Sequence, residues 1–138
     1  MSRYVTRERV HIDRIATAWA IRRFVDAEAT FAFVERERDP DSLHGIAFDM
    51  RGAELSHRDG KITFEVLLAR YALDGADLAR MARIVRAVDL GEPDDATPEA
   101  AGVRAVFDGI RDGLPSDDLR LAAGFAICDA LSAYCRER

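Results

Sequence analysis

Cysteine is scarce in this sequence, and long apolar runs are absent. The two cysteines, Cys128 and Cys135, stand seven residues apart in one predicted helix, about 10 Å along its axis, which is too far for an internal disulfide. We therefore expect reduced, partly buried thiols. No apolar run approaches the roughly 20 residues that span a bilayer, and the segment 1–9 lacks the apolar core of a secretion signal. These absences predict a cytoplasmic protein without a membrane partner.

Several motifs that would assign a function are also missing. The sequence has no GxxxxGK[ST] or GxGxxG loop, which argues against nucleotide binding through a glycine cradle. It has no GxSxG turn, and neither cysteine lies near a candidate histidine in the sequence, so nucleophilic catalysis has no support. Basic and aromatic residues are not interleaved as they are in proteins that bind single strands. With a net charge of −5, nucleic-acid binding by this chain alone is not expected.

What the sequence does contain is the composition of one folded domain. Its 138 residues are 49% hydrophobic and 33% charged, which is typical of a folded chain of this size, and we treat residues 1–138 as one domain. The charge is uneven, because the segment 1–25 holds six arginines against two acids. That end of the molecule is suited to attract anions. The sequence does not distinguish a monomer from a homodimer.

Hydrophobic periodicity predicts short strands early in the chain and helices later. Strands are expected over 4–6, 30–34 and 45–49, and helices over about 12–25, 63–71, 74–90, 97–113 and from Ser116 onward. A strand, a helix and a further strand in this order form a parallel unit. We therefore predict an α/β fold, a helix-rich single domain with a small, mainly parallel sheet in the N-terminal half and helices in the C-terminal half. Ligand sites in such sheets lie beyond the carboxyl ends of the strands.

Histidines and carboxylates gather near two of these strand ends. His11 and Asp13 are two residues apart where the chain enters its first helix, which places their side chains on one side if the segment is extended. Asp49 ends the third expected strand, and His57 follows in the next turn. Neutral imidazole and carboxylate oxygen are ligands of Zn, Mn or Fe(II). The four residues are candidate metal ligands, and ordinary surface, turn or helix-start roles remain the alternative for each.

Asp89 is placed unfavourably unless something compensates its charge. It falls on the apolar stripe of its predicted helix, four residues after Val85. It also lies at the carboxyl end, where the helix dipole disfavours a negative charge by about 0.3–1 kcal/mol. Burial would add several kcal/mol. Either a metal ion or one of the nineteen arginines could compensate, so Asp89 is a fifth candidate ligand.

The sequence resembles the C-terminal domain of ChrB-type chromate resistance proteins. The resemblance is carried by the long block 5–26, by Phe48-Asp49-Met50, by His57-Arg58 and by 63–68, and it extends through Asp89 and 98–102. It therefore covers nearly the whole chain.

The resemblance implies a role in bacterial chromate tolerance alongside a chromate efflux pump, as a sensor or an accessory protein. Members of the family often carry an additional N-terminal region linked to transcriptional regulation. Because this sequence does not include that region, we do not expect it to act as a repressor by itself.

A fainter similarity concerns the order of candidate ligands. The order resembles that of the metal ligands in DHH-type phosphoesterases. It consists of a His-x-Asp pair before a helix, an aspartate after a strand, a histidine in the next turn and an aspartate after a later helix. In that family two Mn ions activate water for attack on a phosphate. The sequence departs from the pattern, because Arg14 follows Asp13 where that family has a further acid, and His57 stands alone. We expect at most one metal site to remain.

Three hypotheses follow. In the first, a module for chromate resistance holds a transition metal ion (Mn, Zn or Fe), while Arg7, Arg9 or Arg14 meets chromate or another oxyanion. In the second, the same site is a metal-dependent hydrolase with Glu65 or His57 as the general base. In the third, the polar residues form only ion pairs in an interaction domain.

Overall fold

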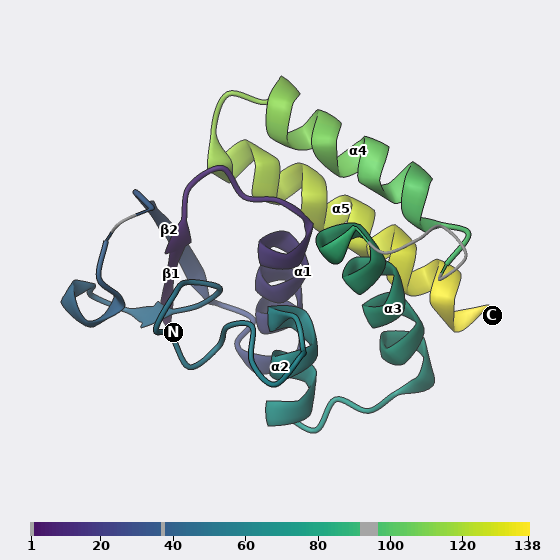
Figure 1. Ribbon diagram of the computed structural model, residues 1–138, viewed down its shortest axis with the longest axis horizontal. Coiled ribbons are helices and arrows are strands. Elements are labelled where there is room, and N and C mark those ends of the chain that lie inside the picture. Colours follow the sequence, from purple (N-terminus) through teal and green to yellow (C-terminus); the bar gives the residue numbers. More distant parts are fainter. Residues whose placement is uncertain (1, 37, 92–96) are drawn as a thin grey trace.

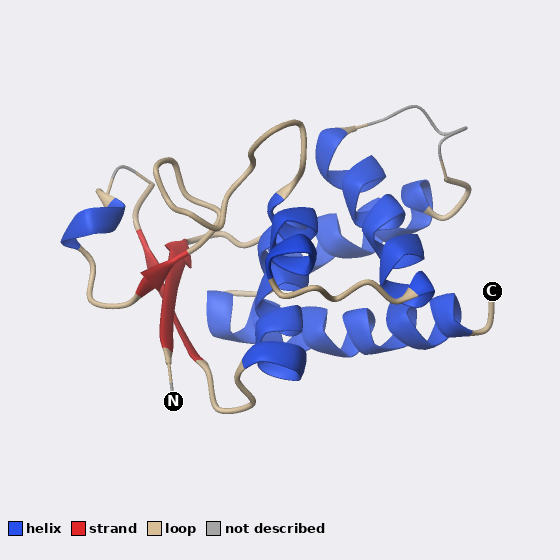
Figure 2. Ribbon diagram, turned by 90° about the horizontal axis from the view of Figure 1, so that it is seen from below, coloured by secondary structure: helices blue, strands red, loops and turns tan. Residues whose placement is uncertain are grey.

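A small sheet lies on one side of the molecule and a group of helices on the other (Figure 2). This computed structural model describes residues 2–36, 38–91 and 97–138. The sheet contains β1 (Arg3–Arg7), β2 (Thr30–Val34) and β3 (Ile46–Ala47), and its order is β2-β1-β3. Both pairings are parallel, with Arg7 opposite Val34 and Val5 opposite Ala47. The carboxyl ends of the three strands therefore lie along one edge.

The helix that follows β1 occupies the centre of the molecule (Figure 1). It is α1 (Ile12–Ala20), and it contacts α2 (Thr63–Arg70), α3 (Ala76–Leu90) and α5 (Asp117–Arg136). Because it is covered on several sides, nearly all of its residues are buried. The expected helix to residue 25 ends differently, since Ile21–Val25 form a π-helical turn in which Asp26 N–H donates to Ile21 O at 2.8 Å. The helix thus widens by one residue per turn before the chain enters β2.

The later helices lie within the expected segments, but two of them begin later than expected. The last helix begins at the N-cap residue Ser116 as expected, and the Ser116 side chain caps α5 by accepting a hydrogen bond from Leu119 N–H. In contrast, the helices expected over 74–90 and 97–113 begin later. The first is α3, which begins after Gly75, and the second is α4 (Ala100–Gly113), which begins after Glu99. A short 3-10 helix (Pro40–Ser42) lies between β2 and β3.

The predicted fold class is confirmed: this is a helix-rich α/β domain with a small parallel sheet in its N-terminal half. The core forms around α1, where Ile12, Ile15 and Trp19 pack with Phe48 and Phe64. Both cysteines are buried free thiols. Among the described helices, none combines the length and apolarity required to cross a membrane.

Candidate metal and anion site

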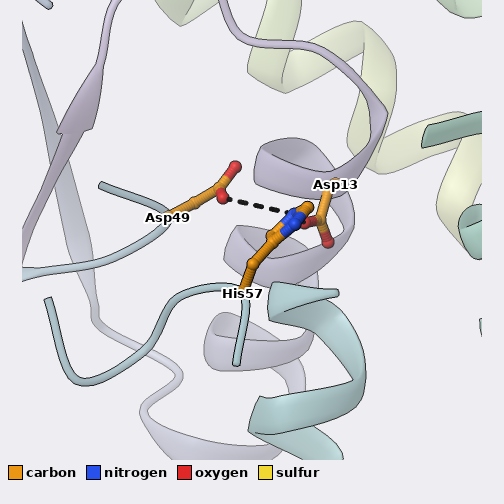
Figure 3. Close-up of side chains that lie close together, drawn as sticks. All are labelled: Asp13, Asp49 and His57. Atoms are coloured by element: carbon orange, nitrogen blue, oxygen red, sulfur yellow. Dashed lines mark hydrogen bonds and ion pairs between the residues drawn. The ribbon is translucent and has the colours of Figure 1, made fainter. Parts of the chain in front are cut away.

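Four of the predicted ligands meet beside the carboxyl edge of the sheet. Asp13 lies in the first turn of α1, which follows β1, and Asp49 lies two residues beyond β3. His57 comes from the turn between β3 and α2, and Asp89 from the last turn of α3. Figure 3 shows Asp13, Asp49 and His57 pointing toward one another from three separate segments. We call these four residues the Asp-His cluster.

The imidazole of His57 is the centre of the Asp-His cluster. Its Nε2 atom lies 3.0 Å from Oδ2 of Asp13, 3.3 Å from Oδ2 of Asp89 and 3.8 Å from Oδ1 of Asp49. One ligand atom each from Asp13, Asp49 and His57 can be chosen so that all lie within 4.8 Å of one another. Such spacing suits donors that share one small cation.

Asp13 is held rigidly, and its side chain is only 2% exposed. Its two carboxylate oxygens accept hydrogen bonds from the backbone N–H groups of Thr63 (3.0 Å) and Phe64 (2.9 Å). These N–H groups belong to the first turn of α2 and have no acceptor within their own helix. Asp13 therefore supplies a cap to α2 from another helix, in addition to its contact with His57.

Asp49 is oriented by two neighbours, Thr63 and Arg14. Oγ1 of Thr63 donates to Oδ1 of Asp49 at 2.8 Å, and Nε of Arg14 lies 3.3 Å from Oδ2. Asp49 also has a positive φ of 48°, an uncommon conformation for a residue other than glycine. Neither contact was predicted from the sequence, because contacts between residues 14 and 35 positions apart leave no local signal.

Burial and mutual repulsion raise the pKa of two carboxylates in the Asp-His cluster, those of Asp49 and Asp89. Burial, followed by the charge of Asp13, raises the pKa of Asp49 to about 6. The same two causes raise the pKa of Asp89 to about 7. The hydrogen bond from His57 to Asp13 is the main cause that raises the pKa of the imidazole to about 9. The cluster therefore favours a positive charge at its centre, which a proton on His57 supplies and which a bound cation could supply in its place.

The Asp-His cluster opens into a cavity of about 550 Å³, which we call the cluster cavity. Besides the four clustered residues, the described residues that line it include His11, Arg7, Arg14, Arg51 and Ser56. A volume of this order is typical of pockets for small molecules. The cavity therefore has room for a ligand beyond a bound ion.

His11 lines the cluster cavity but has a different partner. Its Nε2 lies 2.8 Å from Oδ1 of Asp108 in α4, and its ring packs edge-on against Phe107. Burial lowers the pKa of this imidazole. His11 therefore stands beside the Asp-His cluster rather than within it, and its part in metal binding stays a prediction.

The remaining predicted residues are engaged elsewhere to different degrees. Glu65 accepts a hydrogen bond from Ile62 N–H and pairs with Arg86 at 2.8 Å; it is not among the described residues that line the cluster cavity. Arg9 is exposed and lies 3.7 Å from Asp112. Arg14, by contrast, lines the cluster cavity while it pairs with Asp49.

Comparisons with known proteins agree with the resemblance seen in the sequence. The model of the family described as "ChrB, C-terminal domain" matches residues 4–135. The protein named Protein ChrB from Cupriavidus metallidurans is 40% identical over an alignment of 135 residues, and the match covers 95% of this chain and 40% of that protein. The chain thus spans well under half the length of this relative. No solved structure is matched. The chain belongs to the family of ChrB C-terminal domains.

Proposed function

We propose that this chain binds a divalent transition metal ion through Asp13, Asp49, His57 and Asp89, and that it serves chromate resistance. One observation carries the proposal: carboxylate oxygens of three aspartates lie within 3.8 Å of a single imidazole nitrogen. One nitrogen and several carboxylate oxygens are a ligand set for Zn, Mn or Fe(II). Thiolate ligands are not involved, since both cysteines are buried in the helical core.

A divalent ion would balance the charge of the Asp-His cluster. When ionised, the three aspartates carry three negative charges, and Arg14 beside Asp49 supplies one positive charge. A neutral His57 supplies none. An ion of charge +2 would bring the sum to zero and replace the proton that His57 otherwise holds. Several partly buried carboxylates with so little compensation are costly without a cation.

Family membership supports the biological role. The resemblance to chromate resistance proteins implies a sensor or accessory function, and chromate is itself an oxyanion. Arg7 lines the cluster cavity, and guanidinium groups bind oxyanions through paired hydrogen bonds. We propose that metal and oxyanion bind side by side in this domain.

Binding is favoured over hydrolysis by the position of Glu65. Its carboxylate is committed to the start of α2 and to Arg86, so it is not available to activate water in the cluster cavity. His57 lies among three carboxylates, where a bound metal would occupy the nitrogen needed for proton transfer. The described residues therefore offer better support for a bound ion than for turnover.

Metal content measured by inductively coupled plasma mass spectrometry tests the proposal. Untagged protein is supplied with Mn, Zn or Fe(II) and dialysed before measurement. We expect nearly one ion per chain in the unaltered protein and in His44→Ala, because His44 is exposed and lies outside the cluster cavity. His57→Ala and Asp49→Asn should each remove the ion. Equal metal content in His57→Ala and His44→Ala would overturn the proposal, and the His11→Ala variant shows whether His11 is a further ligand.

A further inference from the structure

Most arginine side chains of this protein have a partner, and those without one are concentrated in one place. Within the described part of the chain, the arginines whose side chains make no hydrogen bond, no ion pair and no ring contact are Arg3, Arg7, Arg36, Arg38, Arg51 and Arg83. Four of these six line a single cavity of about 540 Å³. We call it the arginine cavity, and its described lining is Arg7, Arg36, Arg38, Asp39, Pro40 and Arg51.

The fold explains how these arginines come together. Arg7 is the last residue of β1, Arg36 and Arg38 follow the end of β2, and Arg51 follows β3. Because the three strands are parallel, all four positions lie at the same edge of the sheet. This is the edge at which parallel sheets bind ligands. Arg7 and Arg51 also line the cluster cavity, so the two cavities adjoin.

The charge of the arginine cavity is poorly compensated. Asp39 is the one acid of the described lining, and its Oδ1 already accepts a hydrogen bond from Asp41 N–H. Arg7 is the most buried of the four arginines, and its Nε atom is buried without a hydrogen-bond partner in the described structure. Burial and the nearby charges of Arg14, Arg36 and Arg51 lower the pKa of this guanidinium. Like charges gathered around a buried donor are costly unless an anion binds.

We infer that the arginine cavity holds a tetrahedral oxyanion group, such as phosphate, beside the metal ion of the proposed function. Arg7 is the inner contact, and the exposed Arg36, Arg38 and Arg51 close around the outer oxygens. Guanidinium groups suit this ligand because each presents two parallel N–H donors to two oxygens. The inference rests on the proposed function and deepens it. It states which cavity holds the oxyanion that binds beside the metal ion.

This assignment differs from the anion site expected from the sequence. Arg9 and Arg14 have acidic partners. Of the three arginines expected to bind an anion, only Arg7 lines the arginine cavity. The adjoining cavities, about 550 and 540 Å³, are also of the size that accommodates small organic ligands. A free oxyanion and the phosphate group of an organic monoester offer the same chemistry to the arginines, and the experiment must separate these two sources.

Isothermal titration calorimetry tests the inference with two probes, inorganic phosphate and a nucleoside monophosphate, each with and without Mn²⁺. Arg7→Gln and Arg51→Gln should each weaken binding of the probe at least about tenfold, as expected for loss of a charge-assisted hydrogen bond. Arg3→Gln is the matched control, because Arg3 is an unpaired arginine at the opposite end of the same strand. It should change the affinity less than about twofold. Equal losses in all three variants, or no binding of either probe, would overturn the inference.

Two further measurements keep the result clear. Arg51 is exposed in a turn, so its variant reports on the ligand even if Arg7→Gln lowers the melting temperature. In metal-free protein with EDTA, phosphate should still bind to Asp49→Asn, because the arginines remain. Phosphate binding without any bound metal would therefore support this inference even if the metal proposal failed. Tighter binding of the monoester than of phosphate identifies an organic ligand, and the reverse order identifies a free oxyanion.

Discussion

Replacing Asp13 with alanine should destabilise the metal-free protein, because Asp13 caps a helix that does not contain it. Its carboxylate accepts hydrogen bonds from the backbone N–H groups of Thr63 and Phe64 at 3.0 and 2.9 Å. The N-cap residue of α2 is Ile62, whose side chain has no acceptor. In Asp13→Ala both N–H groups would be buried without a partner, and the favourable interaction of a negative charge with the start of α2 would be lost.

The magnitude follows from these two contacts. A hydrogen bond to a charged group contributes about 1.5–3 kcal/mol, and a buried unsatisfied donor is costly. We expect Asp13→Ala to lower the free energy of unfolding by about 3–5 kcal/mol. A domain of this kind has about 5–15 kcal/mol to lose, so the variant should still fold at 25 °C. Asp13→Asn keeps one carbonyl acceptor and should lose less.

Urea denaturation followed by circular dichroism at 222 nm, with EDTA present, measures this loss. Asp77→Ala is the control, because Asp77 also lies in the first turn of a helix but caps no other helix among the described contacts. It should cost about 0.3–1 kcal/mol through the helix dipole alone. If Asp13→Ala costs no more than Asp77→Ala, the capping role assigned to Asp13 is wrong.

Three further predictions concern other parts of the molecule. Burial and neighbouring carboxylates raise the pKa of Asp89 from 3.8 to about 7, so the metal-free fold loses stability as the pH rises from about 4 to about 7 and the loss is complete above pH 7. Asp89→Asn should therefore add about 1–2 kcal/mol to the free energy of unfolding at pH 8. That gain should shrink at pH 5 in urea titrations, and a gain independent of pH would contradict the assignment. Gly124→Ala should lower the free energy of unfolding by about 1–3 kcal/mol, because a Cβ there would collide with α1. Gly109→Ala should raise it by about 0.5–1 kcal/mol, because open space surrounds Gly109. Thermal melts of the two variants test this difference. Burial raises the pKa of the thiols of Cys128 and Cys135, so Ellman's reagent at pH 8 should modify both far faster in unfolded than in native protein.

Much of the fold could be predicted because its signals are local. The apolar spacing of the first helix and the short β-prone segments are legible in neighbouring residues, and parallel pairing follows from their order. The same logic predicted that Asp13 and Asp49 would lie near one another, since both follow parallel strands. Asp89 was identified from its unfavourable position on an apolar stripe, and the structure places its carboxylate 3.3 Å from His57.

The rest depended on contacts between distant residues. His11 pairs with Asp108, which is 97 positions away, and nothing near either residue indicates the other. Glu65 was one of two candidate general bases, yet its carboxylate pairs with Arg86 on another helix. The arginine cavity was likewise invisible, because Arg36 and Arg51 are ordinary surface arginines until three strand ends are aligned.

One contact also determines when the site can form as the chain is made. Asp117, at the start of α5, accepts hydrogen bonds from the backbone N–H groups of Arg9 and Val10, both at 2.9 Å, and pairs with Arg120. The turn that leads into Asp13 is thus held by a residue synthesised more than 100 positions later. During translation, at about 5–20 residues per second, the nascent chain exists for several seconds without this clamp. The proposed metal site should therefore form only in the finished domain, after α5 has closed over the turn, and not in the emerging chain.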